Sequence, residues 1–178
     1  MQWQVLNNQH QLEKGNRPDV AVGLQKFNEF GYEIGLQYQD ENNQPIYSAY
    51  GICRSKTKFD KYGNISERAF YNEANEPSVH KEAGYHKLII EWDESGNHMK
   101  SLSYYGVDGT PSTHKTRGYH VATYAYNGNN DLIKISYLNT SHALVNRKDN
   151  GISYFSYQYD SEGKLTGVLR FDKEGKKL

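Results

Sequence analysis

Histidine is the first residue type whose spacing in this chain could support chemistry. Four histidines occupy two equivalent positions in two nearly identical segments: His80 and His114, then His86 and His120. If these segments stack, paired imidazoles could bind a transition metal. Asn146 and Ser153 take the two positions in the next copy, and no carboxylate recurs in register with the histidines. We therefore predict no metal site and interpret the histidines as members of a repeated surface.

Carboxylates that recur in predicted turns are the second candidate group: Asp60, Asp93, Asp108 and Asp160. They could bind Ca²⁺ or act as an acid–base pair. Catalytic carboxylates need different environments to separate their pKa values, however, and equivalent positions of a repeat offer similar ones. Ca²⁺-binding β-rolls also require tighter spacing between Gly and Asp. We predict that these side chains cap turns.

Cys53 is the single thiol, which excludes a disulfide framework. Basic neighbours, including Arg54, could lower its pKa, but no adjacent His-Asn or His-Asp pattern supports a nucleophile. The chain also lacks a nucleophile elbow, a phosphate-binding glycine loop and an HExxH motif. We predict no cofactor and a plain strand cysteine.

Regularly spaced aromatic residues are the strongest binding candidates. Tyr71 and Tyr105 follow one predicted strand of each unit, and Tyr85 and Tyr119 precede the other. Exposed rings at such intervals could stack on sugars or on a protein partner, and the alternative is packing within the sheet. The predicted binding residues are Tyr71, Tyr85, Tyr105, Tyr119, His80 and His114.

Charge and hydropathy exclude several classes of protein. Lys plus Arg and Asp plus Glu are both 21 in 178 residues, so the formal net charge is zero. This balance argues against a nucleic-acid binder that relies on phosphate contacts, although Arg54, Lys56, Lys58 and Lys61 could form a local basic stripe. No apolar run is long enough for a membrane span, and the first ten residues do not resemble a secretory signal.

The elements that position these residues follow from an internal repeat of about 33 residues. Five aromatic-Asx pairs recur at intervals of 32 to 34 residues: Phe27-Asn28, Phe59-Asp60, Trp92-Asp93, Tyr126-Asn127 and Tyr159-Asp160. Gly follows the Asx by three residues in four copies, and Asn130 does so in the fifth. A second series of Asx-like tetrads, which starts at Asn7, and a third series of glycines, from Gly51 to Gly151, keep the same phase.

Each Asx-x-x-Gly tetrad predicts a turn between two antiparallel strands. Alternation along the strands, as in Ala122, Tyr124 and Tyr126, predicts one buried and one solvated face. The fold class is therefore all-β: tandem antiparallel hairpins stacked into a twisted or spiral sheet, solenoid-like or an open barrel. We expect one repeat domain over 1–178, with units at about 1–26 (partial), 27–58, 59–91, 92–125, 126–158 and 159–178 (partial).

The stretch Tyr154-Phe155-Ser156-Tyr157-Gln158-Tyr159-Asp160-Ser161-Glu162-Gly163-Lys164-Leu165 resembles the YD repeat of bacterial Rhs proteins. The copies at Trp92-Asp93 and Phe59-Asp60 are similar. The resemblance implies a β-only spiral or shell, used at the cell surface or in a secreted protein to encase a toxin or bind a partner. The period here is longer than that family's usual unit, and the array is short for enclosing a cargo domain.

These observations favour a non-catalytic module that binds or scaffolds a protein or a glycan, with self-association through sheet edges as an option. The alternative is a hydrolase or other enzyme, whose site would lie among the residues that break the repeat. Those residues are Asn130, His98, His142, Asn146 and Asp149.

Overall fold

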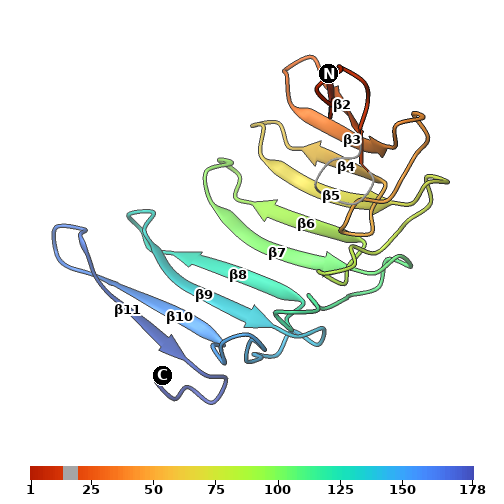
Figure 1. Ribbon diagram of the computed structural model, residues 1–178. Coiled ribbons are helices and arrows are strands. Elements are labelled where there is room, and N and C mark those ends of the chain that lie inside the picture. Colours follow the sequence, from red (N-terminus) through yellow and green to blue (C-terminus); the bar gives the residue numbers. More distant parts are fainter. Residues whose placement is uncertain (14–19) are drawn as a thin grey trace. The chain divides into compact units, whose positions relative to one another are not determined.

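The computed structural model describes residues 1–13 and 20–178, and within these ranges the chain is all-β with no helix. The strands are β1 (Gln2–Gln4), β2 (Val22–Phe27), β3 (Glu33–Gln39), β4 (Arg54–Phe59), β5 (Ile65–Tyr71), β6 (Lys87–Trp92), β7 (Met99–Tyr105), β8 (Val121–Tyr126), β9 (Leu132–Leu138), β10 (Tyr154–Tyr159) and β11 (Leu165–Phe171). Strands follow one another in chain order, and the pairs are antiparallel (Figure 1). The predicted class of antiparallel hairpin repeats is confirmed.

The chain divides into two compact units, Met1–Leu88 and Ile89–Leu178. In the first unit β1 to β5 form hairpins by pairing in sequence, and in the second unit β7 to β11 do the same. The repeat boundaries assigned from the sequence, and the single domain that they imply, stay predictions.

The first turn series closes each hairpin by the expected mechanism. In the turn between β10 and β11, one carboxylate oxygen of Asp160 accepts hydrogen bonds from the backbone N–H groups of Glu162 (3.0 Å) and Lys164 (2.9 Å). Gly163 then takes a φ of 79°, which is strained for a residue with a Cβ. Asn130 has a φ of 68° at the equivalent position, as suits the non-Gly residue that best tolerates this region.

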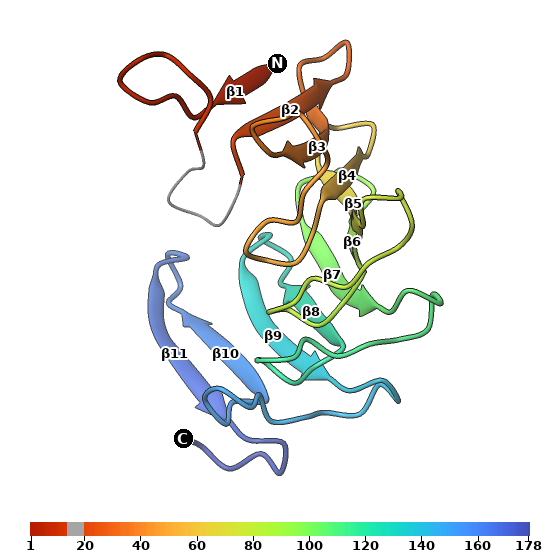
Figure 2. The same cartoon turned by 45° about the vertical axis from the view of Figure 1, so that its right-hand side comes forward.

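All positive-φ residues of the described ranges belong to the three repeat series found in the sequence. The second series includes His10, Asn43, Asn75 and His142, and it makes a turn directly after the second strand of each hairpin. The third series, from Gly51 to Gly151, lies in the long loop that leads to the next hairpin (Figure 2). The periodicity therefore records backbone conformation more faithfully than it records side-chain chemistry.

One residue before each first strand joins two hairpins through its backbone. In the second unit, the Ser153 N–H donates to the carbonyl of Phe171 (2.8 Å), and the Ser153 carbonyl accepts from Tyr137 N–H (2.9 Å). We call this position the hairpin joint; its members are Ala21, Cys53, His86, His120 and Ser153, and all are buried. The joint explains why hairpins with different side chains stack at one fixed register.

Burial of the side chains changes along each strand, from one end to the other, and does not distinguish one face of the sheet from the other. Adjacent residues at the loop end of a strand are buried together, such as Ser136 and Tyr137, although they point to opposite faces. The prediction of one buried and one wet face is therefore wrong. The cause is the connecting loop, because Tyr119 packs on Tyr137 on one face while the next residue, His120, packs on Tyr105 on the other.

Candidate binding site

The predicted ladder of tyrosines and histidines is mainly an internal packing motif. In the first unit, the half-buried His80 ring lies 5.2 Å from both the Tyr50 and the Phe70 ring centroids. Tyr85 is only 8% exposed and contacts Phe70. Burial lowers the pKa of His80, which favours a neutral packed ring over a charged surface group.

The second unit repeats this arrangement. His114 is half-buried against Tyr104 with ring centroids 5.3 Å apart, and Tyr119 is only 4% exposed. Tyr71 and Tyr105 are half-buried, and each meets the joint histidine of its own unit edge-on, at 5.5 Å and 5.4 Å. The binding role of these six residues stays a prediction, and the structure gives each of them a packing partner.

Arg147, not Asn146, occupies the position of His80 and His114 in the later copy. The N–H of His80, His114 and Arg147 each donates to the carbonyl five residues later, at 2.9, 2.9 and 3.0 Å. The prediction that Asn146 takes this position is wrong by one residue, because His80, His114 and Arg147 each lie four residues before the glycine of the loop. Arg147 lies over the Tyr137 ring at 5.0 Å and donates to Asp149, so it also fills the packing role of the histidine.

The buried joint histidines are held by backbone. His120 Nδ1 donates to the Ser112 carbonyl (2.9 Å), and His86 Nδ1 makes the equivalent bond to Ser78 (3.2 Å). Within the described ranges, no group of three or more His, Cys, Asp or Glu side chains is arranged to hold a metal ion.

The residues that break the repeat do not gather in one place. Asn130 and His142 are exposed turn residues at opposite ends of their hairpin, and Asp149 pairs with Arg147. The Asn146 side chain accepts from the backbone N–H of Lys173 (2.7 Å). Each of these residues has a local structural role, so nothing in their placement favours the enzyme alternative.

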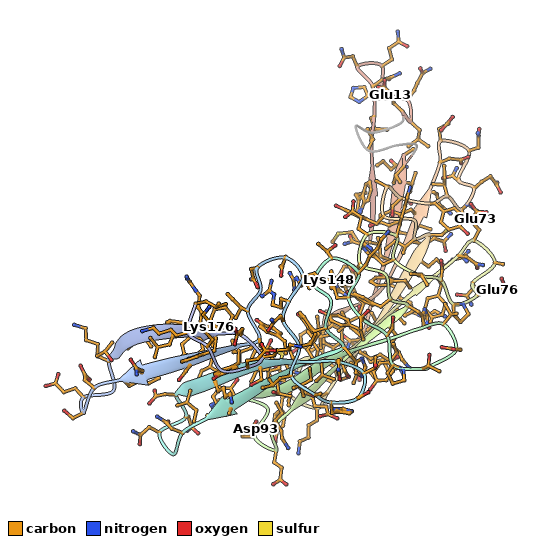
Figure 3. The ribbon with its side chains drawn as sticks, turned by 90° about the horizontal axis from the view of Figure 1, so that it is seen from below. Glu13, Glu73, Glu76, Asp93, Lys148 and Lys176 are labelled. Carbon is orange, nitrogen blue, oxygen red and sulfur yellow. The ribbon has the colours of Figure 1, made fainter. Side chains whose placement is uncertain are left out.

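His98 and Asp93 form the one close pair of titratable side chains among these candidates. His98 Nδ1 donates to the Asp93 carboxylate (2.8 Å), and this bond, with those from Ser95 and the backbone, holds the pKa of Asp93 well below its usual range. Asp93 lies at the turn between β6 and β7 (Figure 3). The His98 ring packs on Tyr126 at 4.6 Å, so the pair braces a turn against the next hairpin.

Cys53 is a fully buried joint residue, and burial raises the pKa of its thiol above the ordinary value. The prediction of a strand cysteine is nearly right, because Cys53 directly precedes β4. A buried thiol with a raised pKa is a poor nucleophile.

Exposed aromatic rings at the hairpin turns of the first unit were missed by the sequence analysis. We call this set the turn-end patch; it comprises Phe27, Phe30, Tyr32, Phe59 and Tyr62. Phe30 is 74% exposed and Tyr62 48% exposed. Tyr32 stacks on Phe59 with centroids 4.8 Å apart, which fixes two rings of the patch, and a hollow of about 510 Å³ lies among the two turns.

Phe30 and Tyr62 occupy the third position of their Asx-x-x-Gly turns. The equivalent residues in the other turns are Ser95, Asn129 and Glu162. The difference between copies at this third turn position is the sequence signal that points to the patch. Exposed apolar surface of this kind usually marks an interaction site.

Comparisons with known proteins leave the family of the chain open. No protein-family model and no curated protein matches it. Among solved structures, it is similar to one titled "Crystal Structure of TcdB2-TccC3-Cdc42", with 14% identity and a TM-score of 0.34 over 88% of this chain and 8% of that one. A second, "Crystal Structure of TcdB2-TccC3-TEV", has 12% identity and a TM-score of 0.32, and covers 86% of this chain and 9% of that one. Both similarities are weak.

In the described part of the chain, no helix has the length and apolar character needed to cross a membrane.

Proposed function

We propose that this chain is a non-catalytic β-repeat module that binds a protein partner through the turn-end patch. The observation that supports the proposal is the pair of exposed rings at equivalent turn positions, Phe30 and Tyr62, in neighbouring hairpins. Exposed aromatic residues supply much of the binding energy of protein interfaces, because they bury a large apolar area with few rotatable bonds.

A protein partner suits the patch better than a glycan. Sugar hydroxyls need polar side chains around the rings, and the Asx side chains of both turns are already bonded to their own turns. One Asp60 carboxylate oxygen accepts from the N–H groups of Tyr62 and Asn64 (both 2.9 Å), and the other accepts from the Asn64 side chain (3.2 Å). The Asn28 side-chain oxygen accepts from the N–H groups of Phe30 (3.1 Å) and Tyr32 (2.9 Å).

The resemblance of the turn motif to YD repeats supports a place in a bacterial surface or toxin-associated protein, with the module outside the cell. This setting is part of the proposal, as is the scaffold role. Rigid hairpins joined by backbone hydrogen bonds suit a module that presents a surface without rearranging.

Site-specific photocrosslinking tests the proposed binding. A benzophenone amino acid placed at position 30 should crosslink one defined protein in the cells that make this chain, identified by mass spectrometry. Position 129 is the matched control, because Asn129 is an exposed, non-aromatic residue at the same turn position. Equal crosslinking at both positions, or none at position 30, would contradict the proposal.

A glycan array tests the alternative ligand class. The wild-type chain should bind no glycan in a manner that depends on Phe30 and Tyr62. The double variant Phe30→Ser, Tyr62→Ser should keep its unfolding free energy within about 0.5 kcal/mol, because both rings are exposed. A glycan signal that this variant abolishes would replace the protein partner by a sugar.

A further inference from the structure

A second surface of the first unit, on β2, β3 and β4, has a different chemistry from the turn-end patch. The register places Lys26 beside Gly35 and Gly35 beside Lys56, in one row across the three strands. Leu24, Gln37 and Arg54 form the next row on the same face. Lys58 lies two residues beyond Lys56 and therefore also points to this face.

Gly35 forms the floor of a groove on this face. The hollow measures about 620 Å³, and it is lined by residues 24–26, 34–37 and 54–58. Most of its lining is apolar, as expected where lysine stems lie beside Leu24. A Cβ built on Gly35 would be 3.6 Å from the Ser55 carbonyl oxygen and 3.8 Å from Lys26 Cβ, so a Cβ is accommodated at ordinary contact distances, and a longer side chain would project into the groove.

The groove carries positive charge that the protein neutralises only in part. Lys58 pairs with Glu67 at 2.9 Å, and this bond raises the pKa of Lys58. Lys56 Nζ lies 4.1 Å from the centre of the Tyr71 ring, and this contact holds the ammonium without cancelling its charge. Arg54 is likewise anchored by neutral groups, since it donates to Gln37 (2.9 Å) and to the carbonyls of Asn72 (3.2 Å) and Glu73 (2.6 Å).

The lining contains no carboxylate, and Lys26 at its border is exposed. Three cations, Lys26, Arg54 and Lys56, therefore surround an apolar floor, two of them fixed in position by the contacts above. This arrangement is complementary to a ligand that carries both carboxylates and aliphatic groups.

We propose that this groove binds an extended, acidic segment of a protein partner. Arg54 and Lys56 are alternate residues of one strand, so their side chains lie about 7 Å apart. The same spacing separates alternate side chains of an extended peptide, and acidic residues at every second position would meet both cations. The groove between β2 and β4 is about 10 Å wide from strand to strand, which is the width of a single extended chain.

A nucleic acid fits these observations less well. Single strands bind through a positive groove together with exposed rings on which the bases stack. No aromatic residue lines this groove, and Lys56 covers the nearby Tyr71 ring.

Fluorescence anisotropy with the full chain tests the proposal. The probes are a labelled peptide that alternates Glu with Val, the same peptide with Gln in place of Glu, and a labelled oligo-dT. The Glu peptide should bind at least about tenfold more tightly than either other probe, and its affinity should fall as salt rises, because exposed charges are screened. Equal binding of the Glu and Gln peptides, or tighter binding of oligo-dT, would overturn the proposal.

Three variants locate the binding. Gly35→Leu should abolish binding without a change of charge, and Lys56→Gln should weaken it about tenfold, a loss within the range measured for single charged contacts. Lys164→Gln, at an exposed turn in the other unit, should bind like the wild type. If Gly35→Leu fails to fold, Lys56→Gln alone decides, and unchanged binding by that variant contradicts the assignment.

The two proposed surfaces are separable by the same assay. The variant Phe30→Ser, Tyr62→Ser should retain binding of the Glu peptide, because neither residue lines the groove. Loss of the peptide in this variant would place the acidic segment on the turn-end patch instead, and the groove proposal would then be wrong.

Discussion

Side chains of very different chemistry occupy the hairpin joint. The repeat at this position therefore does not depend on one type of side chain. Cys53 and Ser153 are both 0% exposed, while His120 fills the same position with a ring. The bond that the carbonyl of the joint residue accepts from the preceding strand is present in all five copies. A polar atom at this position therefore stabilises the protein only if it finds its own partner.

Ser153 offers a direct test, because its hydroxyl is buried without a hydrogen-bond partner. Ser153→Ala should raise the free energy of unfolding by about 1 kcal/mol, since it removes the cost of burying an unpaired hydroxyl. Urea denaturation measures this change, and Ser161→Ala, in an exposed turn, should have no effect. A large loss of stability in Ser153→Ala would show that the hydroxyl does have a partner.

Asp93 makes the free energy of unfolding depend on pH in the acid range. The bond from His98 lowers the pKa of this carboxyl, so its contribution is complete above the unfolded pKa of about 4 and is lost as pH falls below it. Wild type should be more stable than Asp93→Asn at neutral pH, and the difference should shrink in acid. Urea denaturation across the acid range measures it, and Asp160→Asn controls for the loss of a turn carboxylate without a neighbouring imidazole.

At the scale of elements, turns were more predictable than faces. The Asx-x-x-Gly tetrads, with Asn130 in place of Gly in one copy, located the five turns that join β2 to β3, β4 to β5, β6 to β7, β8 to β9 and β10 to β11, because a carboxylate or amide that caps backbone N–H groups leaves a local signature. Alternation failed to predict burial, since whether Tyr137 or Ser136 is covered depends on Tyr119 and His120, which arrive from a loop. Sequence periodicity carries no information about where such a loop lies.

The candidate surfaces escaped prediction for a related reason. Phe30 and Tyr62 are notable only when compared with Asn129 in the same turn position, and the search for repeats emphasised residues that agree. The basic residues around Gly35 were visible as a short stripe on one strand. Their relation to Lys26, on a strand two places away, required the register.

Substitutions at two turn glycines distinguish the effect of backbone strain on stability from the effect of packing. Gly163 has a φ of 79°, whereas Gly128 has no left-handed conformation, and a Cβ on either would meet nothing within 4 Å. Gly163→Ala should therefore lose about 1 kcal/mol, the cost of a Cβ at positive φ, and Gly128→Ala should lose almost nothing. Thermal denaturation compares them, and equal losses would contradict the turn assignment.

At the scale of the whole molecule, stability should be graded within each unit. Each hairpin is bonded to its immediate neighbours, so the free energy is close to a sum of local and nearest-neighbour terms. Amide hydrogen exchange should be faster in β11, which has one strand partner, than in β8 and β9, which have two. Uniform protection across these strands would instead show that the unit opens all at once.

The hairpin joint also bears on how such a chain changes over generations. Because the carbonyl of each joint residue accepts an equivalent bond from the strand before it, unequal recombination between copies of the coding repeat would add or remove one whole hairpin unit and leave these bonds intact. Each inserted hairpin unit would bring its own turns. The residues at these turns could be substituted without a change in the turns of the other units. The number of units and the side chains at their turn tips could thus change independently.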